Sequence, residues 1–142
     1  MIIGLLRVSC LILIASCSDA KDTKPASWLL NKTWSGTVKT TLNDVPQESE
    51  ESYSFDDKGI KLGGMEGAKI SYLTNGDTCE VSVYASATNN EGQTGTSNIV
   101  YRFTRISETE CKLEGTMTGK IDGTVTTSGT KSGTLTATPT VE

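Results

Sequence analysis

Hydrophobic and polar residues alternate along most of the chain from residue 34 onward. Between residues 78 and 86, apolar side chains occupy the odd positions and mostly polar ones the even positions. This period of two is typical of a β-strand with one buried face and one face in water. The pattern predicts eight or nine short strands, at roughly 34–42, 51–56, 59–63, 68–74, 78–86, 97–106, 111–119, 122–128 and 132–138.

The breaks between these stretches contain residues that favour turns. Asp56-Asp57-Lys58-Gly59 and Asn75-Gly76-Asp77 predict hairpin turns, and longer polar loops are expected at 43–51 and 87–95. Strands that follow one another in this way predict an all-β fold. We expect an antiparallel up-and-down meander that closes into a barrel, because closure removes exposed strand edges. A two-sheet β-sandwich is the alternative.

The first sixteen residues follow a different pattern. They carry a single charge, Arg7, and residues 8–15 are mostly apolar. The apolar run is about 15 residues long, whereas a membrane-spanning helix needs about 20. Residues 1–16 are therefore interpreted as a secretory signal peptide, with a short transmembrane or buried segment as the alternative.

The end of this segment carries a more specific motif. Ile14-Ala15-Ser16-Cys17 resembles the lipobox of bacterial lipoproteins, in which a branched apolar residue and two small residues precede a cysteine. The resemblance implies that the sulfur of Cys17 is lipidated and that signal peptidase II cleaves before it. It also implies that the new N-terminus receives an acyl chain such as palmitate. Two or three acyl chains hold a protein firmly on a membrane, whereas one holds only marginally.

The residue after Cys17 bears on the destination. In enteric lipoproteins, Asp directly after the lipidated cysteine resembles a signal for retention in the inner membrane. This chain has Ser18 at that position. The resemblance therefore favours the bacterial outer membrane, facing the periplasm or the cell surface. Residues 17–26, polar and containing Pro25, are expected to form a flexible tether. Residues 27–142 are expected to form a single β-barrel domain.

A second resemblance concerns that domain. Trp34 opens the first strand, and the meander ends in Gly133-Thr134-Leu135-Thr136, as in the small lipocalin-like domains of bacterial lipoproteins. Lipocalins carry Gly two residues before this Trp, where this chain has Lys32. The resemblance implies a cup-shaped barrel, often with an interior cavity, that binds a small hydrophobic or amphipathic ligand through residues still unknown. A protein-interaction or scaffold module is the alternative, suggested by the polar loops.

The chain has four cysteines. Cys10 leaves with the signal peptide and Cys17 is lipidated, so Cys79 and Cys111 remain in an oxidising compartment, where a disulfide between them is expected. This bond requires a sharply curled sheet. Strands two apart lie about 9.6 Å apart in a flat sheet, whereas a disulfide needs Cα atoms within about 7 Å. Two buried free thiols are the alternative.

Two glycines occupy positions that alternate in step with the apolar residues expected to face inward. Gly115 and Gly119 follow Leu113 at even spacing, so they are expected on the inner face. They could leave room for a ligand or for an aromatic ring such as that of Tyr101, and the aromatic ring is the favoured interpretation.

Composition and charge limit the chemistry. The absence of histidine excludes Ser-His-Asp and Cys-His machinery and His-ligated zinc. A formal net charge of −4 and a pI of about 4.9 argue against nucleic acid as a partner. The acidic run Glu48, Glu50 and Glu51 is interpreted as a solvated loop or as a guard against pairing at a strand edge, with weak cation binding as the alternative.

No acidic residue is expected on the inward face, so a carboxylate pair for hydrolysis is not predicted. The sequence therefore predicts a non-enzymatic protein that has no catalytic residue, cofactor or metal site. Its expected partners are the membrane, through the N-terminal lipid anchor, and a small apolar ligand or another protein.

Overall fold

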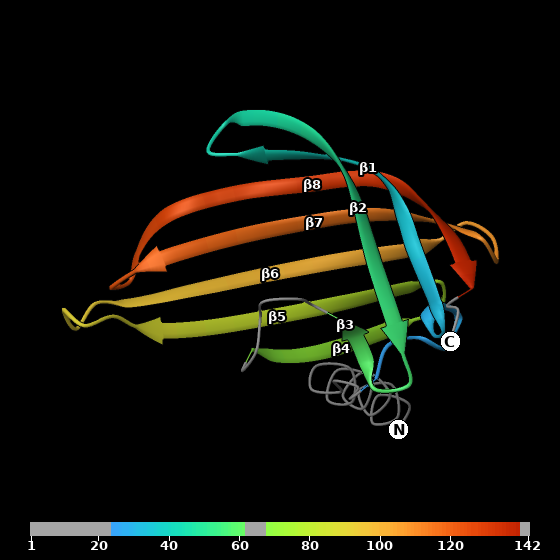
Figure 1. Cartoon of the computed structure of the whole chain (residues 1–142), viewed down its shortest axis with the longest axis horizontal. Coiled ribbons are helices and arrows are strands. Elements are labelled where there is room, and N and C mark those ends of the chain that lie inside the picture. Colours follow the sequence, from blue (N-terminus) through green and yellow to red (C-terminus); the bar gives the residue numbers. More distant parts are fainter. Residues whose placement is uncertain (1–23, 62–67, 140–142) are drawn as a thin grey trace, which may run out of the picture.

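A single antiparallel sheet makes up nearly all of the structure. The computed structural model describes residues 24–61 and 68–139, and their eight strands form one curled half-barrel (Figure 1). A short 3-10 turn, η1 (Ser27–Leu29), precedes the first strand. The strands are β1 (Lys32–Leu42), β2 (Val45–Asp56), β3 (Gly59–Lys61), β4 (Lys69–Asn75), β5 (Thr78–Thr88), β6 (Thr94–Arg105), β7 (Glu110–Ile121) and β8 (Thr124–Pro139). The predicted all-β, up-and-down meander is confirmed, and the sandwich alternative is wrong because the described strands belong to one sheet.

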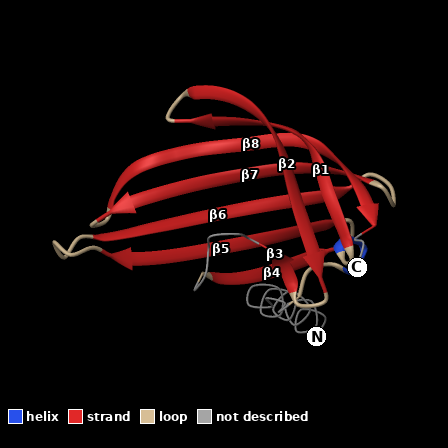
Figure 2. Ribbon diagram, viewed as in Figure 1, coloured by secondary structure: helices blue, strands red, loops and turns tan. Residues whose placement is uncertain are grey.

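The strand order explains the curl. Neighbours in the sheet run β3-β2-β1-β8-β7-β6-β5-β4, so β1 pairs with both β2 and β8. The β1–β2 hairpin crosses the face of the long strands β5–β8 (Figure 2). The two edges of the sheet, β3 and β4, are bridged by a side chain, because the Ile60 amide donates a hydrogen bond of 3.0 Å to the Tyr72 hydroxyl.

Alternation buries the odd-numbered residues of β2 and β5–β7 at one end of the half-barrel. Aromatic rings fill this end: Phe103 lies edge-on to Phe55, with ring centroids 5.4 Å apart, and to Tyr53 at 5.7 Å. The Trp34 ring nitrogen donates a hydrogen bond of 3.3 Å to the Leu29 carbonyl oxygen, so η1 closes this end. The largest completely buried side chains are Trp34, Phe55, Phe103, Leu29, Leu113, Leu135, Val38, Val81, Val83, Cys79 and Cys111.

Beyond this core the strands continue into a second half that is open. The first residues of β8 are exposed, as are the last residues of β5 and the first of β2. The inner face of this open half is concave and accessible. The half-barrel therefore has a closed end filled by side chains and an open end that is accessible. The candidate site lies where the two ends meet.

The sharp curl occurs where β1 meets β8, and glycine permits it. A Cβ atom on Gly133 would lie 2.6 Å from the Thr37 carbonyl oxygen, and one on Gly129 would lie 2.5 Å from that of Thr41. Gly36 is equally close to the backbone of β8. Any side chain at these positions would push the two strands apart.

Several predicted boundaries differ from the observed ones. Residues 45–51, expected within a loop, belong to β2 because they pair with β1, although residues 45–50 are exposed. The strands expected at 122–128 and 132–138 are one strand, since Gly129 and Gly133 let β8 bend without ending it. Ala26, expected in the tether, is buried in the core.

The expected disulfide between Cys79 and Cys111 is absent, and both residues are buried free thiols. Across β6, Cys79 pairs with Phe103 and Cys111 with Arg105, so the cysteines are two strands apart and offset by two residues. In a flat sheet this offset separates Cα atoms by about 12 Å, well beyond the reach of a disulfide. Burial also raises the pKa of the Cys111 thiol to about 12, so the thiol is neutral at physiological pH.

The close contact of β1 and β8 can be tested by substitution. Gly133→Ala is expected to lower the free energy of unfolding by about 1–3 kcal/mol, because the added methyl group meets backbone that must shift. Gly95→Ala is the matched control, since its Cβ would have no neighbour closer than 3.8 Å. Urea unfolding measures both. Equal stabilities of the two variants would contradict this packing.

Candidate functional site

A pocket opens on the concave inner face, directly beyond the core. Its volume is about 240 Å³. Strands β1, β2, β7 and β8 supply its walls, which bring together residues far apart in the sequence. The lining residues are Thr40, Leu42, Gln47, Ser49, Glu51, Met117 and Lys131.

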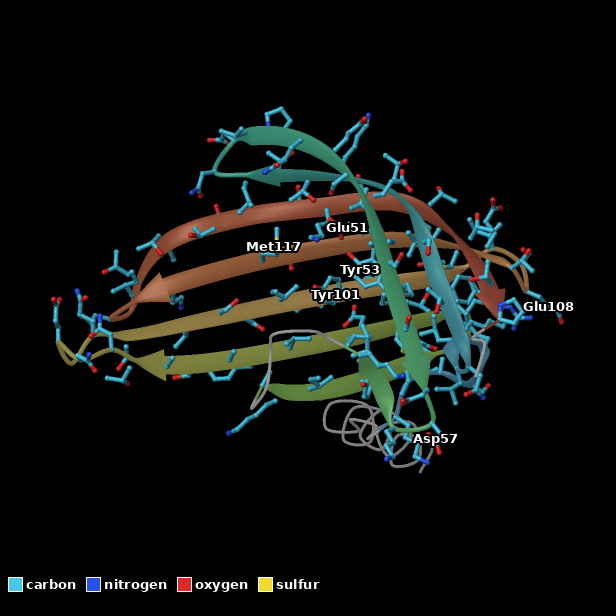
Figure 3. The ribbon with its side chains drawn as sticks, viewed as in Figure 1. Glu51, Tyr53, Asp57, Tyr101, Glu108 and Met117 are labelled. Carbon is cyan, nitrogen blue, oxygen red and sulfur yellow. The ribbon has the colours of Figure 1, made fainter. Side chains whose placement is uncertain are left out.

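The floor of this pocket is an ion pair. Lys131 Nζ donates a hydrogen bond of 2.7 Å to Glu51 Oε1, and the Tyr53 hydroxyl donates to the same oxygen. Ser49 Oγ donates to Glu51 Oε2 at 3.3 Å. The side chains of Lys131 and Glu51 are 15% and 21% exposed, which makes this the most buried ion pair among the described residues. Figure 3 places Glu51 and Tyr53 on β2.

The pair is electrostatically balanced. Burial alone would raise the pKa of Glu51, but hydrogen bonds from Lys131 and Tyr53, together with the charge of Lys131, hold this pKa below its usual value. Burial and the hydrogen bond to Glu51 raise the pKa of Tyr53 far above its usual value. At neutral pH Glu51 is therefore a carboxylate and Tyr53 a neutral phenol.

Thr40 adds a buried hydroxyl without a partner. The residue is 8% exposed, and register places it between Gln47 of β2 and Lys131 of β8. Thr40 Oγ1 makes no hydrogen bond in the described part of the chain. A buried hydroxyl without a partner costs about 1–3 kcal/mol. Thr40 also lines the pocket, but its oxygen is covered, so a bound ligand satisfies this hydroxyl only if the side chain turns toward the pocket.

Aromatic rings separate the ion pair from the core below. The rings of Tyr53 and Tyr101 are inclined at 66°, with centroids 5.5 Å apart, and Figure 3 labels both residues. A Cβ on Gly115 would lie 3.4 Å from the Val100 carbonyl oxygen, 3.5 Å from Lys131 Cβ and 3.7 Å from the Tyr101 ring, all ordinary contacts, so Gly115 lies beside the ring but is not required to make room for it. Gly119 instead faces the Thr127 side chain, whose Cβ would be 3.3 Å away.

Larger hollows lie elsewhere: one of about 480 Å³ over β5–β8, one of about 320 Å³ over β1, β7 and β8, one of about 340 Å³ beside the start of β1, and one of about 310 Å³ on the β1–β2 hairpin. They are weaker candidates. In the hollow of about 480 Å³, Arg102 already binds Glu80 through Nη2 at 2.6 Å, and Arg102 is half exposed. None of these four hollows is lined by a residue with a buried side-chain polar atom that lacks a partner.

The acidic run was only partly predicted. Glu48 and Glu50 lie exposed on β2, whose other edge pairs with β3 only over Ser54–Asp56, so they occupy an unpaired strand edge, as the guard interpretation expects. The expectation that no acid faces inward is wrong, because Glu51 does. No group of three potential metal ligands was found within residues 24–61 and 68–139.

Sequence reasoning also missed Thr40 and Lys131. Both are polar residues at inward positions, and Lys131 reaches Glu51 from 80 positions away, so local spacing carries no signal for the contact. The predicted lipidation site, Cys17, lies outside the described residues. No helix in the described part is both long and apolar enough to cross a membrane.

Comparison with known proteins adds no assignment. No protein-family model matches the chain, and no match was found among curated proteins or solved structures.

The ion pair makes a pH-dependent prediction. Glu51→Gln is expected to lower the free energy of unfolding by about 1–3 kcal/mol near pH 7, because Lys131 loses its charged partner. The usual pKa of this group is 4.5, and the folded pKa is lower. Ionised Glu51 therefore stabilises the fold above about pH 4.5, and this stabilisation is lost as pH falls through the folded pKa. The difference between wild type and variant should shrink on acidification, which urea unfolding followed by tryptophan fluorescence measures.

Glu48→Gln is the control for this experiment. Glu48 pairs with Lys39 at 3.8 Å, but their side chains are 58% and 73% exposed. Such a pair contributes about 0–1 kcal/mol. If Glu51→Gln and Glu48→Gln had equal effects, or if the effect of Glu51→Gln did not change with pH, the buried ion pair would be contradicted.

Proposed function

We propose that this protein is a lipid-anchored lipoprotein of the bacterial envelope whose half-barrel binds a small amphipathic ligand without catalysis. Cys17 carries the anchor, and the protein resides at the outer membrane, facing the periplasm or the cell surface. The ligand occupies the inner pocket above Glu51 and Lys131. The observation that supports this most strongly is the partnerless hydroxyl of Thr40, buried in the wall of a concave pocket.

The size of the pocket limits what it encloses. Its volume of about 240 Å³ corresponds to roughly eight water molecules at about 30 Å³ each. Pockets that enclose a drug-sized molecule usually measure about 300–1,000 Å³. The pocket therefore holds a head group or a short chain, and any longer tail extends along the open inner face.

A ligand-binding function is better supported than a protein-interaction module. The long loop expected at 43–51 is mostly strand β2, and only residues 89–93 connect β5 and β6. The unpaired edge of β2 carries Pro46, Glu48 and Glu50, which oppose pairing with another strand.

The anchor is tested by substituting the cysteine of the lipobox. Cys17→Ser is expected to abolish labelling by radioactive palmitate and cleavage by signal peptidase II, because the sulfur that accepts the lipid is gone. Cys10→Ser, a cysteine only seven residues earlier, should leave labelling and cleavage unchanged. If the Cys17 variant were still labelled and still sedimented with membranes, the proposed anchor would be wrong.

Ligand binding is tested by blocking the pocket. Native mass spectrometry of the protein extracted from its own membranes should detect a bound small molecule, and Ser49→Trp should remove it by filling the pocket. Glu48→Trp is the matched control, since Glu48 is also exposed on β2 but faces outward. Wild-type protein with no bound molecule, or equal loss in both variants, would count against the proposed function.

A further inference from the structure

The inner pocket has both unused hydrogen-bond donors and unused acceptors, since Gln47 and the hydroxyls of Thr40 and Ser49 also line it. An ammonium group has three N–H bonds, and Lys131 uses one of them on Glu51. Glu51 Oε1 already accepts from both Lys131 and Tyr53, and Oε2 accepts from Ser49. Thr40 adds a hydroxyl without a partner. A ligand whose hydroxyl groups both donate and accept would therefore match the unused groups.

The charges in the pocket cancel. Lys131 Nζ and Glu51 Oε1 are 2.7 Å apart, so any group placed against this pair meets a positive and a negative charge at nearly the same distance. The other lining residues are uncharged. A carboxylate or an ammonium group would gain no net attraction from this pair and would still lose its hydration, whereas an uncharged polar group loses much less hydration.

Two side chains in the pocket wall are apolar. Leu42 of β1 and Met117 of β7 line the pocket beside the polar groups. They offer a surface on which a short alkyl chain can lie, out of water, next to the oxygens that Lys131 and Thr40 would bind.

We infer that the inner pocket selects an uncharged, oxygen-rich head group joined to an alkyl or acyl chain, as in a monoacylglycerol, over charged amphiphiles of the same length. This inference rests on the proposed ligand-binding function. Thr40 and the free N–H bonds of Lys131 hold the head-group oxygens, Leu42 and Met117 contact the chain, and the Glu51 carboxylate cancels the attraction of Lys131 for anions.

Three soluble probes that share a four-carbon chain test this selectivity. They are monobutyrin, which is a neutral glycerol ester, butyrate and butylammonium. The full mature protein is held in lipid nanodiscs, and saturation-transfer NMR measures the dissociation constants, with empty nanodiscs as the blank. Wild type should bind monobutyrin at least about tenfold more tightly than either ion, because an ion loses hydration in the pocket without gaining net attraction.

Substitutions at two adjacent threonines distinguish binding in the pocket from binding elsewhere on the surface. Thr40→Val keeps the shape of the side chain and removes its hydroxyl, and it should weaken monobutyrin binding by about 3–10-fold. Thr41→Val is the control, because Thr41 is the next residue of β1 and faces the other side of the sheet; it should leave binding unchanged. Equal effects of the two substitutions would overturn the role of Thr40.

The decisive variant reverses the charge balance. Glu51→Gln leaves Lys131 without its counterion, so butyrate should bind at least about tenfold more tightly than to wild type and become the preferred probe. Wild type that prefers butyrate or butylammonium overturns the selectivity while leaving a ligand-binding protein. If folded wild type binds none of the three probes, both the selectivity and the proposed function fail. If Glu51→Gln does not fold, the wild-type ranking and Thr40→Val decide.

Discussion

The close approach of β1 to β8 is the constraint on which the rest of the structure depends. Carbonyl oxygens of β1 lie where side chains at Gly129 and Gly133 would have to be, so the first and last long strands meet at a sharp bend. The bend carries the β1–β2 hairpin across the long strands (Figure 1). Without it, Glu51 of β2 and Lys131 of β8, whose strands are not neighbours, could not meet across the inner face.

The ion pair marks the boundary between two halves with different properties. On one side, Tyr53 and Tyr101 begin a core of rings packed edge-on, and water is excluded. On the other side, the same strands continue with both faces accessible. A charged pair inside the core would lose more solvation than it gains. At the boundary, Lys131 and Glu51 keep partial contact with water and can still hold a ligand.

Alternation predicted the strands that bury one face. The stretch expected at 78–86 is β5, and that expected at 97–106 is most of β6, because burial imposes a period of two. The start of β2 could not be predicted in this way, since residues 45–50 are exposed and owe their strand conformation to pairing with β1. The candidate site was missed for a related reason: Thr40, Glu51 and Lys131 are polar residues at inward positions, and only the folded register brings them together.

Chemical-shift mapping tests the central claim, that the concave inner face is a binding site, most directly. Monobutyrin added to ¹⁵N-labelled protein in nanodiscs should shift the backbone amide resonances of Thr40, Ser49, Glu51 and Lys131, and should leave those of the outward-facing residues of β6–β8 in place. Shifts confined to the outer face around Arg102, or no shifts at all in folded protein, would contradict the account.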